Sequence, residues 1–282
     1  MNCYLCSEQQ FTGRKGSVRD APQLRILECA ACGLVFLDSS EHIRAGHYAD
    51  SGMHGDELPA IDAWLRECAS DDRRRFEALR DEIANRKLLD FGCGAGGFLR
   101  LAAEFAASAS GIEPERRVQD HWRGRLRLLP ELAAAERDFD LITAFHVVEH
   151  LPDPRATLAE LAAHLKPGGR LVVEVPSSED ALLTLYDNDA FQRFTYWSQH
   201  LYLFNSANLR RLGEQAGLEV VAVRQVQRYP LANHLHWLSR GKPGGHQRWS
   251  FLRSAGLDEA YANALAALGR CDTLWAVFGQ RA

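Results

Sequence analysis

The sequence has no long apolar run and no excess of basic residues, and each absence excludes a class of protein. Across 282 residues, no stretch approaches the roughly 18 consecutive apolar residues that a membrane span requires. The first residues show no basic segment followed by an apolar one, so we expect no signal peptide and a cytoplasmic protein. Lys and Arg number 33 against 37 Asp and Glu, a formal net charge of -4, which argues against a generally basic surface for nucleic acid.

A disulfide framework is not indicated either, because the seven cysteines are an odd number in a chain without an export signal. Four of them form two Cys-x-x-Cys pairs, Cys3 with Cys6 and Cys29 with Cys32. Two such thiolate pairs complete a tetrahedral zinc site, and Gly33 follows the fourth thiol, where the chain must turn around the metal. Four free thiols or a redox pair remain the alternative. The spacing predicts a zinc ribbon, and its closed coordination predicts a structural rather than a catalytic metal.

The rest of the chain has the composition and patterning of a globular α/β protein. Hydrophobic residues make up 46% and charged residues 25%, enough apolar material for a core. We divide the chain into a ribbon at 1–40, a linker with covering helices at 41–85 and a larger domain at 86–282. In the larger domain, strand-like apolar runs alternate with helical segments, which predicts a mostly parallel sheet with helices on both faces. Residues 227–273 are long for a connection and are expected to form an insertion.

A glycine-rich turn follows the first predicted strand of the larger domain and opens a helix. Its glycines, Gly92, Gly94 and Gly96, allow positive φ and close approach of a ligand to backbone amides at a helix N-terminus. Asp90 ends the strand, where it would meet a cationic amino-acid group and repel a pyrophosphate. Glu113 ends the next strand, where a carboxylate accepts both hydroxyls of a ribose. The pattern predicts a cofactor site at this edge of the sheet.

Four segments carry a family resemblance. They are residues 88–96, 111–114, 139–151 and 165–171. In order and spacing the chain resembles the class I S-adenosylmethionine-dependent methyltransferases, from about residue 86 to 280. The resemblance implies a Rossmann-like sheet, methyl transfer and S-adenosylmethionine as the cofactor. It also implies that Asp90 and the glycines hold the methionine part of the cofactor, Glu113 the ribose, and Phe145 and His146 the sulfonium side.

A ribbon in front of such a domain is similar to the bacterial sugar methyltransferases of polysaccharide and natural-product pathways. In the nucleotide-sugar C-methyltransferases of that group, a Tyr-His-Glu-His-like segment supplies a catalytic Tyr and His. The similar segment here is 196–204, where His200 matches the final histidine while Trp197 and Gln199 replace the tyrosine and the glutamate. Methylation of oxygen needs only one base, and a histidine suits that task at neutral pH. We therefore predict methyl transfer to a hydroxyl of a small polar acceptor, a sugar or nucleotide-sugar, with His200 as the base.

Further acceptor contacts are expected from the same segment and from the basic, aromatic stretch 228–249. That stretch is interpreted as a lid whose cations meet a phosphate or another polar group, arginine through its planar fork. The predicted substrate-binding residues are Tyr196, Tyr202, Arg240, Lys242 and His246. A solvated loop is the other interpretation of this stretch.

Three other functions remain open. An RNA methyltransferase would use the ribbon to hold its substrate, although the net acidity argues against it. A quinone-precursor type of O-methyltransferase would hold a divalent metal with Glu149 and His150, which are otherwise interpreted as packing at the cofactor pocket. Those residues lie in a His-x-x-Glu-His run, but a strand ends near His146 and Pro152 follows, so a protease helix is not expected. A regulator would bind the cofactor without turnover.

Overall fold

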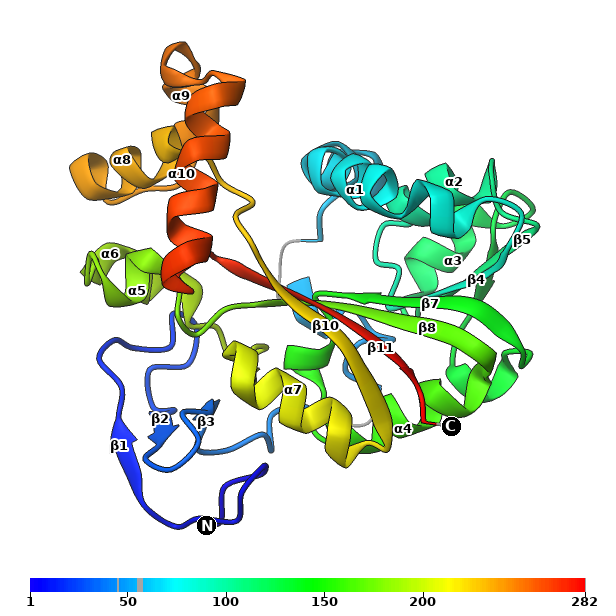
Figure 1. Cartoon of the computed structure of the whole chain (residues 1–282), viewed down its shortest axis with the longest axis horizontal. Helices are drawn as coiled ribbons and strands as arrows, with labels where there is room; N and C mark the ends of the chain where they lie inside the picture. Colours follow the sequence, from blue (N-terminus) through cyan, green and yellow to red (C-terminus); the bar gives the residue numbers. More distant parts are fainter. Residues whose placement is uncertain (45, 55–57, 282) are drawn as a thin grey trace.

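The computed structural model describes residues 1–44, 46–54 and 58–281, and within these ranges the strands form a seven-stranded and a four-stranded sheet. The larger sheet is the centre of the molecule, with helices above and below it (Figure 1). This arrangement confirms the predicted α/β class. In the described part of the chain, no helix is both long and apolar enough to cross a membrane.

The larger sheet has the strand order β10-β11-β8-β7-β4-β5-β6. Its strands are Lys87–Phe91 (β4), Ser108–Ile112 (β5), Arg127–Leu129 (β6), Phe139–Phe145 (β7), Leu165–Pro176 (β8), Leu218–Val226 (β10) and Thr273–Gln280 (β11). Strands β4 to β8 pair in parallel, whereas β11 runs antiparallel to both β8 and β10. The strand order switches between β4 and β7, which is where such sheets bind ligands.

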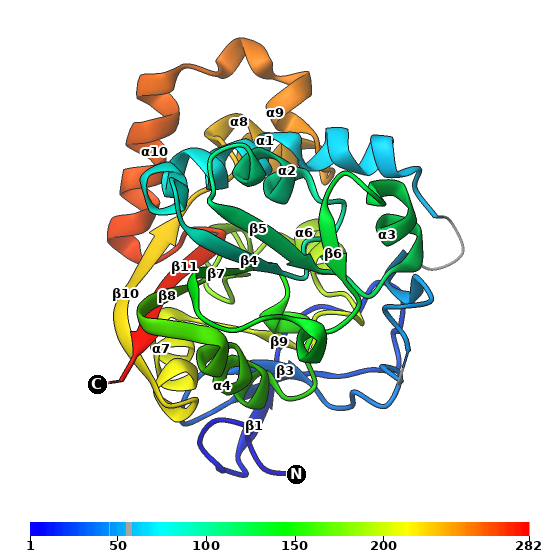
Figure 2. The same cartoon turned by 90° about the vertical axis from the view of Figure 1, so that its right-hand side faces the viewer.

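Two layers of helices bury the two faces of this sheet (Figures 1 and 2). One layer contains Ile61–Ile83 (α1), Gly97–Ala103 (α2) and Arg116–Trp122 (α3), and the other contains Pro154–His164 (α4) and Ser206–Gln215 (α7). Neighbouring strand residues point to opposite faces, so Leu88 and Leu141 pack with α1, whereas Leu89 and Ile142 pack on the α4 side. The covering helix expected before residue 86 is therefore part of the layer over the larger sheet.

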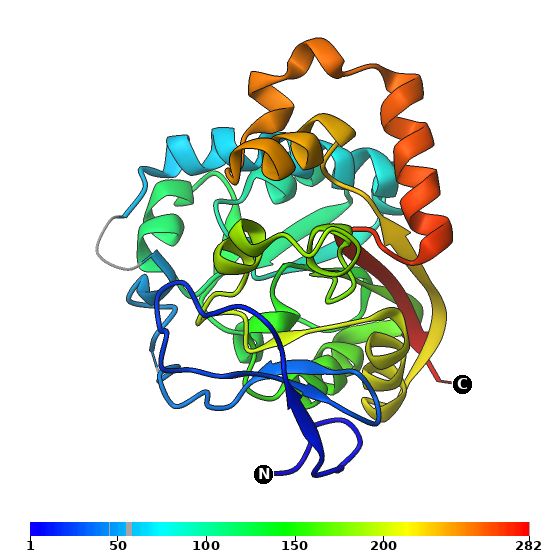
Figure 3. The ribbon, with the colours of Figure 1, turned by 90° about the vertical axis from the view of Figure 1, so that its left-hand side faces the viewer.

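The smaller sheet joins the N-terminal ribbon to the larger domain. Its strands are Phe11–Gly13 (β1), Ile26–Cys29 (β2), Val35–Leu37 (β3) and Tyr202–Leu203 (β9), in the order β1-β2-β3-β9 with antiparallel pairing. The strand β9 comes from the larger domain, so the ribbon sheet is completed by a segment distant in sequence. Figure 3 shows the ribbon against this flank of the molecule.

The stretch between β10 and β11 forms helices beyond the end of the sheet (Figure 1). They are Leu231–Arg240 (α8), Gly245–Arg248 (α9) and Ala255–Leu268 (α10), with a 3-10 turn at Ser250–Leu252 (η4). Trp237 of α8 is buried against Phe191 and Phe194 of helix α6 (Asp189–Thr195). The remaining short elements are Gly52–His54 (η1), Leu132–Ala134 (η2), Val148–His150 (η3) and Ala181–Thr184 (α5).

Candidate active site

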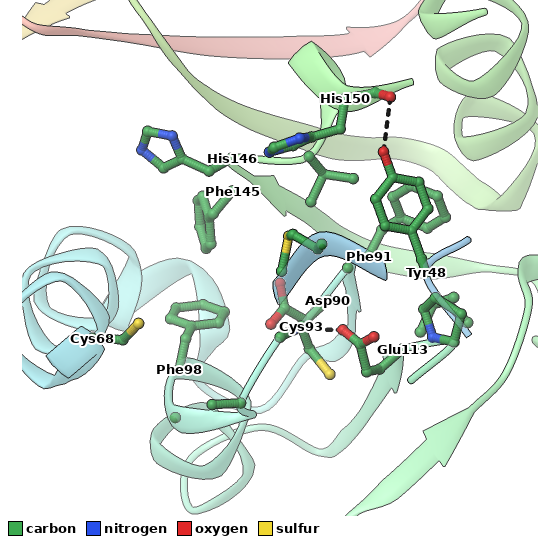
Figure 4. Close-up of a pocket in the computed structure, with 18 of the residues that line it drawn as sticks. Tyr48, Cys68, Asp90, Phe91, Cys93, Phe98, Glu113, Phe145, His146 and His150 are labelled. Atoms are coloured by element: carbon green, nitrogen blue, oxygen red, sulfur yellow. Dashed lines mark hydrogen bonds between the residues drawn. The ribbon is translucent and has the colours of Figure 1, made fainter. Parts of the chain in front are cut away.

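A cavity of about 880 Å³ lies at the carboxyl ends of β4, β5 and β7. Single ligands occupy pockets of about 300–1,000 Å³, so this cavity is large enough for a cofactor and a small second molecule. One end is lined by the glycine-rich turn and Glu113, and the other by His146, His150 and His200. The close-up in Figure 4 shows side chains from both ends around the open space.

The glycine-rich turn has the backbone that the sequence predicts. Gly92, Gly94 and Gly96 have φ angles of 71°, 52° and 84°, in the left-handed region that favours glycine. A Cβ atom on Gly92 would lie 2.4 Å from a methyl group of Val147, and one on Gly96 would lie 2.7 Å from Nε1 of Trp122. Gly92 and Gly94 line the cavity, whereas Gly96 precedes α2 and packs against the indole.

Two buried carboxyl groups flank this turn. Asp90 lies at the end of β4 and accepts a hydrogen bond from Oγ1 of Thr143 at 2.7 Å. Glu113 follows β5 and accepts hydrogen bonds from the amides of Gly94, at 2.8 Å, and Glu115, at 3.0 Å. Burial raises the pKa of Asp90 to about 7 and that of Glu113 to about 7, against hydrogen bonds that favour their charged forms. Both residues line the cavity, as the sequence predicts.

The end of β7 brings strained backbone to the middle of the cavity. Phe145 and His146 both line it, and Figure 4 shows Phe145 beside Phe98. His146 has a φ of 55°, which is uncommon for a residue other than glycine, and its amide donates to the carbonyl oxygen of Glu174 at 2.8 Å. Strain of this kind persists only where the surroundings hold the residue in place. The chain therefore presents the His146 ring at a fixed position.

Three histidines that line the cavity, His146, His150 and His200, cluster around the fully buried side chain of Glu149 at the end away from the glycine-rich turn, the acceptor end. Oε1 of Glu149 lies 3.1 Å from Nδ1 of His146, and Nδ1 of His150 lies 2.8 Å from the carbonyl oxygen of Gln199. One ligand atom from each of Glu149, His150 and His200 lies within 4.8 Å of the others. Burial, followed by the neighbouring His150, lowers the pKa of His200 to about 3, so this imidazole is neutral at physiological pH.

Two atoms of this cluster are buried with no hydrogen-bond partner among the described residues, Oε2 of Glu149 and Nδ1 of His200. Leaving a buried polar atom unpaired is costly, and each case calls for an explanation such as a bound ion. The sequence identified His200 and, separately, the Glu149 and His150 pair. It gave no signal that the three would meet, because His200 lies about 50 residues further along the chain.

A network of charged side chains supports the cluster from the α1 side. Glu174 of β8 is fully buried and accepts from Nη2 of Arg75 at 2.6 Å and from Nη2 of Arg74 at 2.7 Å. Arg228 donates to Nε2 of His146 at 2.9 Å and pairs with Asp71. Buried charges are tolerated only when they are paired in this way. The network fixes the orientation of the His146 ring at the cavity wall.

The predicted substrate-binding residues do not line the cavity among the described residues. Tyr196 is buried beside Gly16 of the ribbon, and the Tyr202 hydroxyl donates to the carbonyl oxygen of Pro152 at 3.3 Å. Arg240, Lys242 and His246 belong to the α8–α9 region outside the cavity wall. Those five assignments remain predictions that the arrangement of side chains does not favour.

Other residues line the cavity where the five substrate-binding residues were expected. Trp197, Arg228 and Tyr229 line the acceptor end of the cavity, together with Cys68 and Asp71 of α1. Arg228 and Tyr229 come directly after β10, which is parallel to the central strands, and the carboxyl ends of such strands meet at the ligand edge. That position was the available signal, whereas the contribution of α1 could not be read from the sequence.

The four paired cysteines of the ribbon come together in one cluster. Sγ of Cys3 lies 3.6 Å from Sγ of Cys32, and Sγ of Cys6 lies 3.4 Å from Sγ of Cys29. All four sulfur atoms lie within 4.8 Å of one another. Tetrahedral zinc with bonds of about 2.3 Å places its sulfurs about 3.8 Å apart, so the tetrad has the size of such a site.

Comparison with known proteins is consistent with this geometry. A family model described as a methyltransferase domain matches residues 61–223, from the start of α1 into β10. The chain belongs to this methyltransferase family. With the strand order, the glycine-rich turn and the two acids, it is an S-adenosylmethionine-dependent class I methyltransferase.

Curated relatives and solved structures extend the comparison. Ubiquinone biosynthesis O-methyltransferases from Thiobacillus denitrificans and Xanthomonas euvesicatoria pv. vesicatoria are each 28% identical to this methyltransferase. The matches cover 56% of this chain and 75% of the first relative, and 60% and 77% for the second. An S-adenosylmethionine-dependent methyltransferase from Archaeoglobus fulgidus shares the fold with a TM-score of 0.51, 18% identity and coverage of 76% of this chain and 93% of that one. A chain from a complex with the Haloferax volcanii Trm112 methyltransferase activator gives a TM-score of 0.52, 17% identity and coverage of 80% and 100%.

Proposed function

We propose that this methyltransferase transfers the methyl group of S-adenosylmethionine to one of two adjacent hydroxyl groups on a small acceptor, with a catechol-like ring as the preferred class. The observation that carries this proposal is the close approach of His150 and His200, which line the cavity, to the fully buried carboxyl group of Glu149. The names of the relatives, which are O-methyltransferases of ubiquinone biosynthesis, support a ring acceptor of the quinone-precursor type. This choice replaces the sugar hydroxyl as the leading acceptor.

The cofactor end of the cavity fits S-adenosylmethionine. Gly92 and Gly94 let the turn pack closely against Val147 and Trp64 at the cavity wall, where Cβ atoms would crowd these side chains, and the Glu113 carboxylate is fixed by two backbone amides. When bound, the cofactor supplies a methyl group on a positively charged sulfur. Asp90 and the turn would hold its methionine part, Glu113 its ribose hydroxyls, and Phe145 and His146 would border the sulfonium. These roles are the ones predicted from the sequence.

The acceptor end fits a divalent metal ion. Oε2 of Glu149, one nitrogen of His150 and Nδ1 of His200 would be its ligands, and the first and last of these atoms otherwise lack a partner. Two imidazoles and one carboxylate leave coordination positions open for oxygen. When bound, such an ion supplies a Lewis acid that lowers the pKa of a hydroxyl and orients two neighbouring oxygens. In this proposal His200 contacts the reacting end as a metal ligand rather than as the lone base predicted from the sequence.

The protein's own contribution to the reaction is alignment and exclusion of water. A carbon–oxygen bond forms as the carbon–sulfur bond of the sulfonium breaks, so the products are the methyl ether, S-adenosylhomocysteine and one proton released to solvent. Phe145, Trp197 and Tyr229 give the acceptor end apolar walls suited to a ring. Holding both reactants in line accounts for a large part of the rate in such a displacement.

A sugar diol is the second candidate, because it offers the same pair of oxygens and because the family match leaves out much of the chain. The ribbon and the whole α8–α10 region lie outside residues 61–223, so the surroundings of the acceptor can differ from those in the relatives.

Acceptor panels separate these possibilities. The purified protein is incubated with radiolabelled S-adenosylmethionine and 3,4-dihydroxybenzoate, with 3,5-dihydroxybenzoate as the matched compound whose hydroxyls are not adjacent. We expect transfer to the first compound to be faster by about a hundredfold, and to fall after treatment with EDTA and recover with Mn²⁺. Faster transfer to UDP-glucose than to the catechol would favour the sugar. Label in an RNA fraction alone would contradict both.

We further propose that the four paired cysteines bind one structural zinc ion per chain, supported by the sulfur distances given above. Elemental analysis of the purified protein is expected to find one zinc. Cys32→Ser should lose it and lower the melting temperature, because a structural zinc contributes directly to folding. Cys271→Ser is the control, since Cys271 is a buried thiol outside the tetrad. Equal zinc content in the two variants would contradict this assignment.

A further inference from the structure

The segment that carries His200 is a turn between α6 and β9, and the ribbon (residues 1–40) holds much of it. In β3, Val35 pairs with Leu203 and Phe36 with Tyr202. The Leu37 amide donates to the carbonyl oxygen of Leu201 at 3.0 Å, so the backbone contact continues to the residue next to His200. The turn at 196–201 therefore takes part of its shape from strand β3.

A second contact holds the other side of the same turn. Oδ1 of Asp20 accepts from the Ser198 amide at 3.0 Å, and Oδ2 accepts from the Ser198 hydroxyl at 2.7 Å. The amide of Arg19 donates to the carbonyl oxygen of Tyr196 at 2.9 Å. The Arg19 guanidinium lies 4.6 Å from the centre of the Trp197 ring. Asp20 thus fixes the residue that lies two positions before His200.

Two histidines that follow the ribbon add to this support. Nε2 of His42 donates to the carbonyl oxygen of Ser198, and Nε2 of His47 to Oε1 of Gln199, each at 2.7 Å. The carbonyl oxygen of Gln199 is also the partner of Nδ1 of His150. A displaced turn would therefore move His200 and remove the partner of His150 at the same time.

The ribbon also contacts the segment that follows His150. The Tyr4 hydroxyl, between the first two cysteines, donates to Asp153 and accepts from the Arg155 amide at 2.9 Å. Asp153 is the N-cap of α4 and accepts from the Ala156 amide. The ribbon thus contacts both chain segments that supply the histidine cluster. These segments are about 50 residues apart in the sequence.

We propose that the ribbon is an internal clamp for the histidine cluster and that Asp20 is a positioning residue for His200. The catalytic part of this inference rests on the proposed function, whereas the mechanical part does not. The strand edge of β3, which a separate partner would otherwise pair with, is taken by β9 of the same chain. The ribbon therefore acts on the reaction through the turn at 196–201, without touching the acceptor itself.

Asp20→Ala tests the clamp, and Asp38→Ala is a closely matched control. Asp38 accepts from the amide and from Nε of Arg25, so it too loses one backbone and one side-chain hydrogen bond, but within the ribbon. Hydrogen exchange of the peptide 196–204 is measured in both variants. We expect about tenfold faster exchange in Asp20→Ala and wild-type exchange in Asp38→Ala, because only the first variant removes the hydrogen bond of the Ser198 amide.

Kinetics give the second measurement. Asp20→Ala is expected to lower kcat for the catechol by about tenfold or more, as the loss of groups that orient ligands does. The KM for S-adenosylmethionine should stay within about twofold, because Asp20 does not line the cavity. Asp20→Asn should restore most of kcat, since its amide oxygen can still accept from the Ser198 amide.

The outcomes separate the clamp from the proposed function. Equal exchange of 196–204 in Asp20→Ala and Asp38→Ala overturns the clamp, as does a kcat that falls equally in both. Faster exchange in Asp20→Ala with a wild-type protein that methylates no acceptor supports the mechanical clamp and overturns the proposed function. If Asp20→Ala does not fold, Ser198→Ala supplies the exchange comparison, because it removes the hydroxyl contact to Oδ2 of Asp20; the acceleration should be smaller, since the amide of residue 198 keeps its partner.

Discussion

Glu149→Gln protein is expected to fold and to bind S-adenosylmethionine normally, and to lose about a hundredfold or more in kcat. The amide keeps the shape of the fully buried side chain and can still accept from His146, but it places an NH₂ group where Oε2 faces the two imidazoles. An NH₂ group donates and does not ligate a metal. Loss of a Lewis acid costs several kcal/mol of transition-state stabilisation. Mn²⁺ binding by calorimetry and methyl transfer to the catechol measure the two effects.

The control for this substitution is Glu219→Gln, the same chemical change on the exposed side of β10. It should change neither Mn²⁺ binding nor kcat. Normal turnover of Glu149→Gln in buffer treated with EDTA would contradict the metal site, and the cluster would then be packing at the cofactor pocket, the other interpretation of the sequence.

Gly92→Ala is expected to weaken S-adenosylmethionine binding by about tenfold or more and also to lower the stability of the fold. The residue has a φ of 71°, which costs a side chain about 1–2 kcal/mol. The new methyl group would also stand 2.4 Å from a methyl group of Val147, so the cofactor turn or the end of β7 must shift. Calorimetric titration with the cofactor measures the loss directly.

Gly124→Ala separates backbone strain from crowding. Gly124 has a similar φ of 75°, and a Cβ atom there would meet nothing within 4 Å. Both variants should therefore lose stability in thermal melts through backbone strain, Gly92→Ala more because of its added contact with Val147, while only Gly92→Ala should lose affinity for the cofactor. Equal cofactor affinity in the two proteins would mean that the turn tolerates the shift and that Gly92 is not required at the site.

The cofactor half of the site could be predicted from the sequence because its determinants are local. Asp90, Gly92 and Gly94 are consecutive or nearly so, and the φ values and close contacts follow from residues in one turn. Glu113 comes one strand later, and parallel strands bring their carboxyl ends together. The paired cysteines are equally local within each pair, and the structure brings the two pairs together as expected.

The acceptor half depends on contacts that no local pattern encodes. The insertion was expected to send Arg240, Lys242 and His246 to the acceptor, but its segments satisfy one another: Nδ1 of His236 bonds the carbonyl oxygen of Lys242, and His246 lies beside Tyr229. Charge in a connection shows only that it is hydrated. The place of Arg228 is set by Asp71 of α1, far away in the sequence.

The union of His200 with Glu149 and His150 illustrates the same limit. The run from His146 to His150 suggested a metal site with two protein ligands, and the 196–204 segment suggested an independent base. The approach of His200 to the other two residues emerges only when β9 is added to the ribbon sheet. A pairing between short strands of two and three residues leaves almost no periodic signal in the sequence.

The pairing of β3 with β9 has a consequence for how the molecule is made. The ribbon precedes the larger domain along the chain, so it emerges before that domain during synthesis. It contains its own metal-sized tetrad, so strands β1 to β3 can pair before the larger domain is made. Its contacts to the His200 turn join residues as far as 178 positions apart, and contacts of such separation form late. Competence for methyl transfer is thus a final step of folding, reached after the cofactor-binding half of the sheet has been synthesised.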